Sequence, residues 1–242
     1  MSPKVIVVTG TNRGIGLALA TQLNQRGHTV IATVRSKAKA ADTPLASLPN
    51  VKLVELDADN LATIDSAVDD IEKIAPEGID ELWNNFGVYN LGQNSTSVRT
   101  VVPADLQQVF QINATAPIYL TSRLLPLLEK RATKKVVFVS TLAASFDFTK
   151  KFAEMLAQWN APFIYGASKS ALNMAALYFH LQLNQSGFTI VPIHPGVVLT
   201  DMNPMGQIET EESATKMLEV VDPVTAKDDF VLRSYDGSVV AW

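Results

Sequence analysis

The sequence contains no cysteine and only three histidines. The lack of cysteine excludes disulfide bonds, iron–sulfur clusters and thiol nucleophiles. The histidines His28, His180 and His194 lie far apart in the sequence, and none has neighbours typical of metal ligands, so no metal site is expected. No stretch reaches about 18 uninterrupted apolar residues, so we expect no transmembrane helix.

Charge is also sparse. Charged residues make up 18% of the chain, the net charge is −4, and no block of basic residues occurs. Nucleic acids and anionic membranes are therefore unexpected partners. Apolar residues make up 47%, which is enough for a hydrophobic core and argues against disorder. The first residues lead directly into an apolar run without the features of a cleaved signal, so we expect a cytoplasmic protein.

Short β-branched runs alternate with helical patterns along the chain. Strands are predicted at 5–8, 29–34, 51–55, 79–83, 136–140 and 189–194, and helices at 15–27, 61–74, 105–130 and 163–185. This alternation predicts an α/β fold: a Rossmann-type doubly wound parallel sheet of about seven strands, with helices on both faces in three layers. No repeat or linker composition divides the chain, so we expect a single domain, 1–242.

A glycine-rich loop follows the first predicted strand and precedes a helix. Gly10 permits a tight turn, and Gly14 and Gly16 lack the Cβ atoms that would keep a phosphate from the backbone. The helix then offers free N–H groups to a pyrophosphate. In this strand–loop–helix context the loop predicts a dinucleotide site, with a plain structural turn as the alternative. Its predicted cofactor contacts are Gly10, Asn12, Arg13, Gly14, Ile15 and Gly16.

The second strand ends in Arg35, where sites specific for NAD usually carry an acidic residue. Arg35 and Arg13 are suited to bind a 2′-phosphate, which favours NADPH over NADH; the alternative is two solvated arginines. Asp57, after the third strand, is suited to accept a hydrogen bond from the adenine amino group. Alternatively it caps the next helix, although Asp59 or Asn60 fits that role better.

Tyr165 and Lys169 are four residues apart in a predicted helix, so their side chains leave the same face. An ammonium beside a phenol favours the phenolate and lowers its pKa, which suits a group that exchanges protons with a carbonyl or an alcohol. A half-buried tyrosine beside a solvated lysine is the alternative. Asn113 interrupts the apolar face of the predicted 105–130 helix. Either it holds a helix distortion and a water that relays protons to Lys169, or it caps a second helical segment.

Together these features resemble the short-chain dehydrogenase/reductase family from the first strand to beyond residue 202. The family's glycine loop matches 9–16, and its Asn-Asn-Ala-Gly element matches 84–87 with Phe86 in place of Ala. Its central Asn, its Tyr-x-x-x-Lys pair and its Pro-Gly turn match Asn113, Tyr165 with Lys169, and Pro195-Gly196. The terminal residues 235–237 and 240–242 resemble a subgroup that contains fungal polyketide ketoreductases and bacterial C-factor-like proteins.

The resemblance implies an NADPH-dependent carbonyl reductase of secondary metabolism acting on a hydrophobic, aromatic or polyketide-type ketone. In that scheme Tyr165 protonates the carbonyl oxygen, Lys169 holds the nicotinamide ribose, and Thr141, or Ser140 if the strand is shifted by one residue, orients the carbonyl. The family pattern favours Thr141. Further cofactor contacts are implied for Asn84, Asn85, Gly87, Tyr165, Lys169, Pro195, Gly196, Val198 and Thr200. The family also implies a homodimer or homotetramer formed through helices 105–130 and 163–185.

Three features depart from the family pattern or extend it. Phe86 stands where the family usually has Ala beside the adenosine, so its larger ring is expected to change the placement or the affinity of the cofactor. The segment 142–163 is longer than usual and carries Phe152, Met155, Leu156 and Trp159 at helical spacing, so it is either a cap over a hydrophobic substrate or a helix packed on its own domain. The segment 201–221 is a second lid candidate. A cyclase, dehydratase or isomerase on this scaffold, or a non-catalytic NADPH-binding protein, are the alternative functions.

Overall fold

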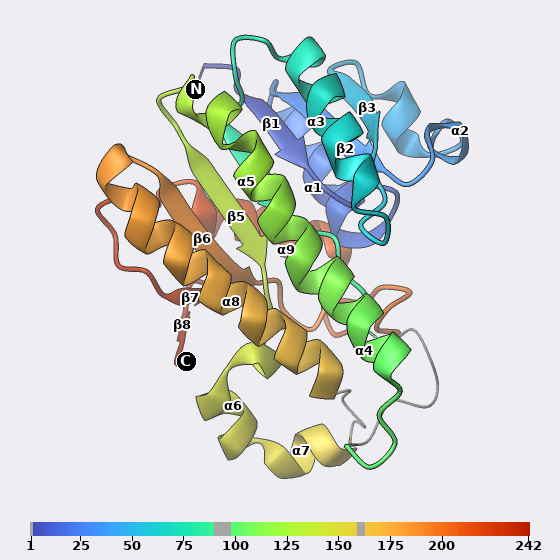
Figure 1. Ribbon diagram of the computed structural model, residues 1–242, viewed down its shortest axis with the longest axis vertical. Helices are drawn as coiled ribbons and strands as arrows, with labels where there is room; N and C mark the ends of the chain where they lie inside the picture. The colour runs from blue at the N-terminus through green and yellow to red at the C-terminus, as the bar shows by residue number, and fades with distance from the viewer. Residues whose placement is uncertain (1, 90–97, 159–162) are drawn as a thin grey trace.

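The computed structural model describes residues 2–89, 98–158 and 163–242. One eight-stranded sheet runs through it (Figure 1). The strands are β1 (Val5–Val8), β2 (Thr29–Val34), β3 (Val51–Glu55), β4 (Glu81–Asn84), β5 (Lys135–Val139), β6 (Thr189–His194), β7 (Leu232–Ser234) and β8 (Val239–Val240). The principal helices are α1 (Gly14–Gln25), α3 (Ala62–Ile74), α4 (Pro103–Phe110), α5 (Ala116–Glu129), α8 (Phe163–Leu183) and α9 (Thr210–Val221).

The sheet has the strand order β3-β2-β1-β4-β5-β6-β7-β8. All neighbouring strands are parallel except β8, which is antiparallel to β7. The predicted doubly wound sheet is confirmed, with one strand more than the seven expected. The chain moves in one direction from β1 to β3 and in the other from β4 onwards. The carboxyl ends of β1 and β4 therefore form the switch point at which such sheets bind ligands.

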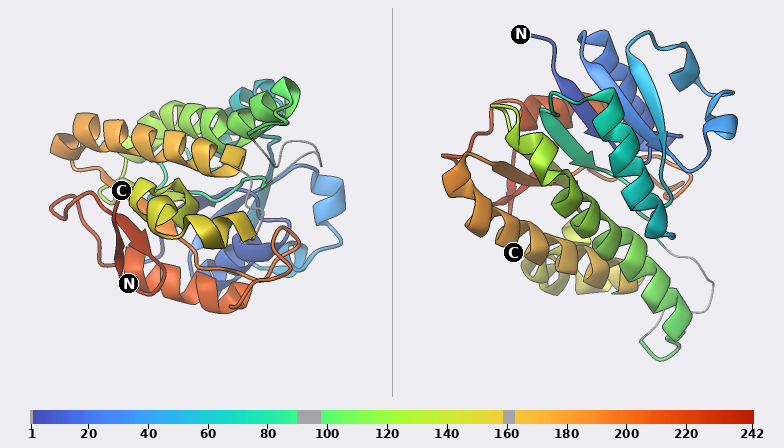
Figure 2. Two further views of the ribbon diagram at one scale, coloured as in Figure 1. Left: turned by 90° about the horizontal axis from the view of Figure 1, so that it is seen from below. Right: turned by 45° about the horizontal axis from the view of Figure 1, so that its top comes forward.

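Helices cover both faces of the sheet, and the views in Figure 2 show the three layers. On one face α3, α5 and α8 pack over a core that includes Val7, Leu82 and Phe138. On the other face α1 and α9 pack over a core that includes Ile6 and Trp83. Neighbouring residues of one strand enter opposite cores because side chains alternate across a sheet, and this explains why β1 is apolar throughout.

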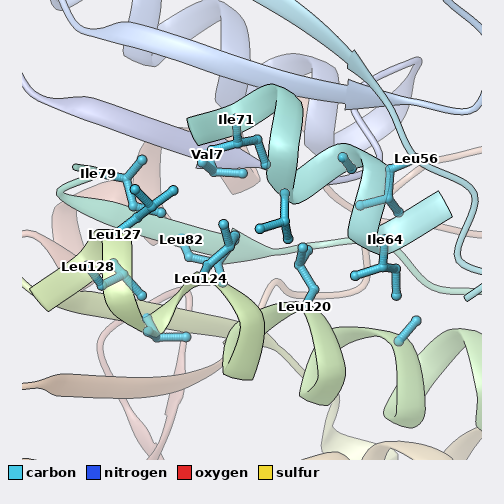
Figure 3. Close-up of a cluster of buried hydrophobic side chains, with 14 of the residues drawn as sticks. Val7, Leu56, Ile64, Ile71, Ile79, Leu82, Leu120, Leu124, Leu127 and Leu128 are labelled. Atoms are coloured by element: carbon cyan, nitrogen blue, oxygen red, sulfur yellow. The ribbon is translucent and has the colours of Figure 1, made fainter. Parts of the chain in front are cut away.

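The core between α3 and α5 is formed by apolar side chains at helical spacing (Figure 3). Leu120, Leu124 and Leu127 of α5 are spaced by four and three residues and lie on one face, almost fully buried. They meet Ile64 and Ile71 of α3 above the sheet. Each such side chain contributes about 1.5–3 kcal/mol when it is fully buried. This packing fixes α5, and with it the segment that leads into α5.

The predicted 105–130 helix is interrupted. Between α4 and α5 the residues Gln111–Thr115 form a π-helical turn, and Asn113 lies in its middle, fully buried. Of the two roles open for Asn113, the helix distortion is therefore observed. The capping role is not, because Thr115, the residue before α5, itself has helical backbone angles.

The lid expectation for 201–221 is wrong for its second half. Residues 210–221 form α9, whose Ala214, Met217, Leu218 and Val221 are fully buried against the core beneath α1. Their spacing produces one apolar helix face, so α9 belongs to the outer layer. The preceding turn stays exposed, with Met202 at 43% and Met205 at 83% of their surface accessible. Any lid is thus confined to the residues before α9.

The long segment after β5 forms the 3₁₀ turn η3 (Leu142–Ala144) and the short helices α6 (Phe146–Lys151) and α7 (Ala153–Gln158). Both helices lie beyond the carboxyl end of β5, apart from the sheet (Figure 1). Helix α6 buries none of its residues, and Phe146 is 71% exposed. This favours the cap over a helix packed on its own domain. Trp159 lies outside the described residues, as does the side chain of Leu156.

Smaller elements complete the chain. The connection between β2 and β3 contains the helix α2 (Lys37–Ala40) and the 3₁₀ turn η1 (Pro44–Ser47), and η4 (Asn184–Ser186) follows α8. No helix in the described parts of the chain has the length and apolar character required to cross a membrane.

Candidate active site

Thr9 joins the two strands at the switch point. Its hydroxyl accepts hydrogen bonds from the backbone N–H groups of Asn85 and Phe86, at 2.9 and 3.2 Å, and donates to the carbonyl of Trp83. The Asn85 amide in turn donates to the Thr9 carbonyl at 2.9 Å. These bonds fasten the loop after β4 to the loop after β1. The two segments predicted to hold a cofactor are thus brought together.

The glycine loop has the backbone that its sequence predicts. Gly10 and Gly14 have φ of 68° and 59°, in the left-handed region that favours glycine. A Cβ on Gly16 would lie 2.2 Å from the Gly10 carbonyl oxygen, so the close turn requires glycine there. The first turn of α1 has no acidic residue and no capping side chain. Its N–H groups therefore suit a phosphate anion, and the loop fits a dinucleotide.

The two arginines predicted to bind a 2′-phosphate are both exposed, but Arg13 has a partner. Its guanidinium lies 2.5 Å from the Asp201 carboxylate, and both side chains are about 70% exposed, at 69% and 71%. This pair bridges the glycine loop and the turn after Pro195-Gly196. Exposed ion pairs contribute only about 0–1 kcal/mol, so an incoming phosphate can displace Asp201.

Asp57 follows β3, as predicted, at the edge of the same group of loops. One of its carboxylate oxygens accepts from the backbone N–H of Asp59 at 3.1 Å. The capping alternative does not apply to it, because Asn60 accepts from the N–H of Ala62 at the start of α3. Asp57 thus shapes a turn next to the site and caps no helix.

The side chain of Asn84 does not face the predicted cofactor site. It is buried and donates to the Thr121 hydroxyl on α5 at 2.9 Å, so the amide that was expected at the cofactor instead holds β4 against α5. Asn85 does face the glycine loop, as described above. The ring of Phe86 packs against the core covered by α3 and α5. A Cβ on Gly10 would lie 3.0 Å from the Phe86 Cβ, so glycine at position 10 eases the close approach of the two loops.

The two hydroxyls at the end of β5 point in different directions. The Ser140 hydroxyl donates to the Asn173 side-chain oxygen at 2.7 Å and is buried. Thr141 instead shares a side-chain hydrogen bond with Tyr165. Alternation along an extended backbone explains why only one hydroxyl faces Tyr165. Thr141, the residue that the family pattern favours, is therefore the hydroxyl placed beside Tyr165.

Helix α8 carries Tyr165 and Lys169, one turn apart. Gly166 lets α8 approach η3 closely, because a Cβ there would lie 2.7 Å from the Ala143 carbonyl oxygen. Ser170 strengthens the same contact by donating to the Ala144 carbonyl at 2.9 Å. The approach of these two elements brings the Tyr165 ring to Thr141.

Lys169 is buried, and its ammonium donates to the Val139 carbonyl at the end of β5, at 2.8 Å. Burial lowers the pKa of Lys169 to about 8. Gly87 lies beside it, since a Cβ on Gly87 would lie 3.3 Å from the Lys169 nitrogen. Glycine at this position lets the loop after β4 approach Asn113 and the ammonium closely.

The expectation that Lys169 lowers the pKa of Tyr165 is wrong for this structure. The pKa of Tyr165 is raised to about 12, chiefly by burial and then by Tyr89, and the hydrogen bond with Thr141 opposes the rise. Desolvation dominates, and the Lys169 ammonium is directed at the Val139 carbonyl. A phenol with this pKa is neutral at pH 7. That is the form that donates a proton to a carbonyl oxygen.

The Asn113 side chain connects the two halves of the site. Its oxygen accepts from the Val88 N–H, and its nitrogen donates to the Val88 carbonyl, both at 2.8 Å. The nitrogen also donates to the Ser168 hydroxyl at 3.0 Å, and Ser168 donates to the Tyr165 carbonyl at 2.7 Å. The side-chain amide is thus satisfied by the protein. A relay water at Asn113 would have to use its backbone carbonyl.

The residues after β6 form a braced turn. Gly196 has φ of 91°, and Ser213 donates to the Pro195 carbonyl at 2.6 Å. The Leu199 N–H donates to the Ile208 carbonyl at 2.8 Å, while Thr200 exchanges backbone hydrogen bonds with Asn203. Val198 is buried. Thr200 reaches the glycine loop, since a Cβ on Gly14 would lie 3.6 Å from its methyl group. Thr200 therefore borders the glycine loop, and the cofactor contacts implied for Pro195, Gly196, Val198 and Thr200 stay predictions.

Sequence reasoning gave no role at the site to Tyr89, Gly166 or Ser168. Tyr89 follows the Asn-Asn-Phe-Gly element by two residues, and its ring lies 5.0 Å from that of Tyr165. Its position at the carboxyl end of β4 was the available signal. Gly166 and Ser168 lie inside the Tyr-x-x-x-Lys element, where a glycine in mid-helix signals a close approach.

Comparison with known sequences gives consistent relatives. An oxidoreductase of Schizosaccharomyces pombe is 33% identical over 259 residues, covering 98% of this chain and 97% of the relative. A short-chain dehydrogenase of Neurospora crassa is 28% identical over 257 residues, covering 98% and 97%. The similarity thus extends over the whole length of each protein.

Solved structures agree with the sequence relatives. An NADPH-bound carbonyl reductase from chicken fatty liver has a TM-score of 0.88 and 28% identity, with 100% of both chains covered. The carbonyl reductase Sniffer of Drosophila melanogaster has a TM-score of 0.86 and 25% identity, covering 99% of this chain and 100% of that one. The sequence model of the short-chain dehydrogenases matches residues 4–210. With the glycine loop, the Tyr165–Lys169 helix and the doubly wound sheet in place, this chain belongs to the short-chain dehydrogenase family.

Proposed function

We propose that this protein is an NADPH-dependent carbonyl reductase that acts on a hydrophobic, aromatic or polyketide-type ketone in secondary metabolism. One observation carries the proposal. The neutral phenol of Tyr165, bonded to Thr141, lies one helical turn from a buried Lys169, beside the loops that meet at the switch point. A proton donor, a hydroxyl and an ammonium thus converge where a dinucleotide would end.

NADPH is proposed as the cofactor on three grounds. The glycine loop and the uncapped first turn of α1 fit a pyrophosphate. Arg13 and Arg35 supply positive charge near the loop, and no acidic residue stands at the end of β2 where a ribose 2′-hydroxyl would be bound. The chicken carbonyl reductase, which has the same fold, is described as NADPH-bound. When bound, the nicotinamide supplies the hydride.

The remaining chemistry belongs to side chains of this chain. Tyr165 gives its proton to the carbonyl oxygen, and Thr141 donates a hydrogen bond that orients the carbonyl. Lys169 would hold the ribose hydroxyls of the bound cofactor, and its ammonium supplies positive charge as the Tyr165 proton leaves. Asn113 fixes the backbone on both sides of these groups. Position and electrostatics are the protein's contribution to the rate.

The segment after β5 supports a hydrophobic substrate. Phe148 and Phe152 pack together with ring centroids 4.5 Å apart, while Phe146 and Phe152 remain 71% and 44% exposed. Ser145 anchors the segment by accepting from the Phe148 N–H at 2.9 Å and donating to the Ala241 carbonyl. An anchored element with exposed aromatic rings beyond β5 suits a cap over an apolar ketone.

The test is Tyr165→Phe, assayed with a panel of aryl and alkyl ketones by NADPH absorbance. The wild type should oxidise NADPH and should prefer it to NADH. The variant should bind NADPH as tightly while its turnover falls by about 10²-fold or more, because the proton donor is lost. Equal turnover in the two proteins would refute the role of Tyr165. Product formation without net NADPH oxidation would favour a cyclase, dehydratase or isomerase.

We also propose that the protein forms a homodimer or homotetramer through α5 and α8. Helix α8 supports this because Met174, Tyr178 and Leu181, spaced by four and three residues, are 56%, 56% and 63% exposed. Apolar side chains in such a row on an outer helix suit burial against a second copy.

A further inference from the structure

Tyr89 makes the aromatic contact with Tyr165. The two ring centroids are 5.0 Å apart and the planes are tilted by 54°, a geometry in which aromatic pairs attract each other. Tyr89 belongs to the segment after β4, whereas Tyr165 lies on α8, so the contact joins two separate elements. Both side chains are partly buried. The Tyr89 ring thus covers a side of the Tyr165 ring that water would otherwise reach.

The backbones that carry the two rings are held by one side chain. Asn113 bonds both the N–H and the carbonyl of Val88, which directly precedes Tyr89. The same amide donates to the Ser168 hydroxyl, and Ser168 donates to the carbonyl of Tyr165. The π-helical turn that carries Asn113 therefore sets the separation of the two rings. The contact between the two rings is therefore held through the backbones of both segments.

We propose that Tyr89 is a positioning residue, which holds the Tyr165 ring in the orientation needed for proton transfer and keeps water from its hydroxyl. This inference rests on the proposed role of Tyr165 as the proton donor. Tyr89 itself need not touch the substrate, because its effect passes through the ring contact.

Burial is the main reason that the pKa of Tyr165 is raised, and Tyr89 is the second. Burial also raises the pKa of Tyr89, so both phenols are neutral at pH 7. Lys169, a titratable group on the same helix, is directed at the Val139 carbonyl. Removing the Tyr89 ring should therefore lower the pKa of Tyr165 toward that of a solvated phenol.

The experiment compares Tyr89→Phe and Tyr89→Leu with the wild type. Tyr89→Leu removes the ring, so kcat should fall by about tenfold or more while the KM for NADPH stays constant, since misorientation of a reacting group affects the chemical step. Tyr89→Phe keeps the ring and should restore most of kcat. Tyr119→Leu is the control and should leave kcat unchanged, because Tyr119 lies on α5 and its hydroxyl bonds to Asp65 of α3.

A second readout does not depend on activity. Phenolate formation is followed by ultraviolet absorbance during a pH titration of each protein and of the same protein carrying Tyr165→Phe, and the difference isolates residue 165. Its midpoint should move to lower pH in Tyr89→Leu and by a smaller amount in Tyr89→Phe. An unchanged midpoint together with unchanged kcat in Tyr89→Leu would overturn the inference while leaving the proposed function intact. If Tyr165→Phe retains full turnover, the proposed function fails, and the titration still decides whether Tyr89 shields Tyr165.

Discussion

At the scale of single residues, the two hydroxyls that follow β5 have separate tasks. Ser140 is buried, and its bond with Asn173 belongs to the packing of α8 on the sheet. Thr141 is directed at Tyr165 and also accepts from the Ala143 N–H at 3.3 Å. We therefore expect Ser140 to affect stability and Thr141 to affect the proposed reaction. Substitutions at the two positions should separate these effects.

Thr141→Val should lower kcat by about 10²-fold with little loss of stability, because it removes a hydrogen bond to the reacting carbonyl and keeps the shape of the side chain. Ser140→Ala should leave kcat within about twofold of wild type and lower the free energy of unfolding by about 1–3 kcal/mol, because it leaves a buried oxygen of Asn173 without its donor. Steady-state kinetics and urea denaturation measure the two effects. Loss of turnover in Ser140→Ala with retention in Thr141→Val would reverse the assignment.

At the scale of elements, the site depends on how closely α8 approaches η3. Gly166 has no side chain, and the Ala143 carbonyl occupies the space where a Cβ would stand. Glycine inside a helix costs about 1 kcal/mol relative to alanine, so local propensity disfavours it. The close approach that places Tyr165 at Thr141 accounts for its presence.

Gly166→Ala should therefore act on catalysis through geometry. A Cβ placed 2.7 Å from the Ala143 carbonyl oxygen forces α8 and η3 apart and moves the Tyr165 hydroxyl away from Thr141. We expect kcat to fall by about tenfold or more while NADPH binding, measured by fluorescence titration, is retained. Ala167→Ser, on an exposed position of the same helix, is the control and should be neutral. Wild-type kcat in Gly166→Ala would show that the close approach is not needed.

The helices and strands could be predicted wherever the apolar residues followed a single periodicity in the sequence. Short runs rich in apolar residues located the six longer strands, including β4, which has no β-branched residue, whereas β7 and β8, with three and two residues, are too short to give a pattern. The lid expectation for 201–221 is wrong for residues 210–221 because their apolar residues have the spacing of a packed helix. Ala214, Met217, Leu218 and Val221 follow an i, i+3, i+4, i+7 pattern, which is typical of a helix packed on a core.

At the scale of the whole molecule, the position of the site followed from topology. Parallel strands place their carboxyl ends at one edge, so motifs that end separate strands had to meet there. The directions of the side chains did not follow from the topology. The Asn84 side chain is directed to α5, and Arg13 pairs with Asp201, 188 residues away in the sequence. The pKa of Tyr165 also depends on burial, which no local spacing encodes. Long-range packing decides these features, so they required the structure.

The proposed association of subunits can be tested through the exposed row of apolar side chains on α8. If Met174, Tyr178 and Leu181 are buried against a second copy, light scattering should give a mass that is a multiple of 26.3 kDa for the wild type. Leu181→Glu places a charge in that interface, whose desolvation disfavours pairing, so the mass should fall to that of one chain at micromolar concentration. Ile74→Glu is the matched control, because the Ile74 side chain is 37% exposed at the end of α3, and it should leave the mass unchanged. A wild type that is already monomeric would contradict the proposed pairing, and Tyr165, Lys169 and Thr141 would then have to work within a single chain.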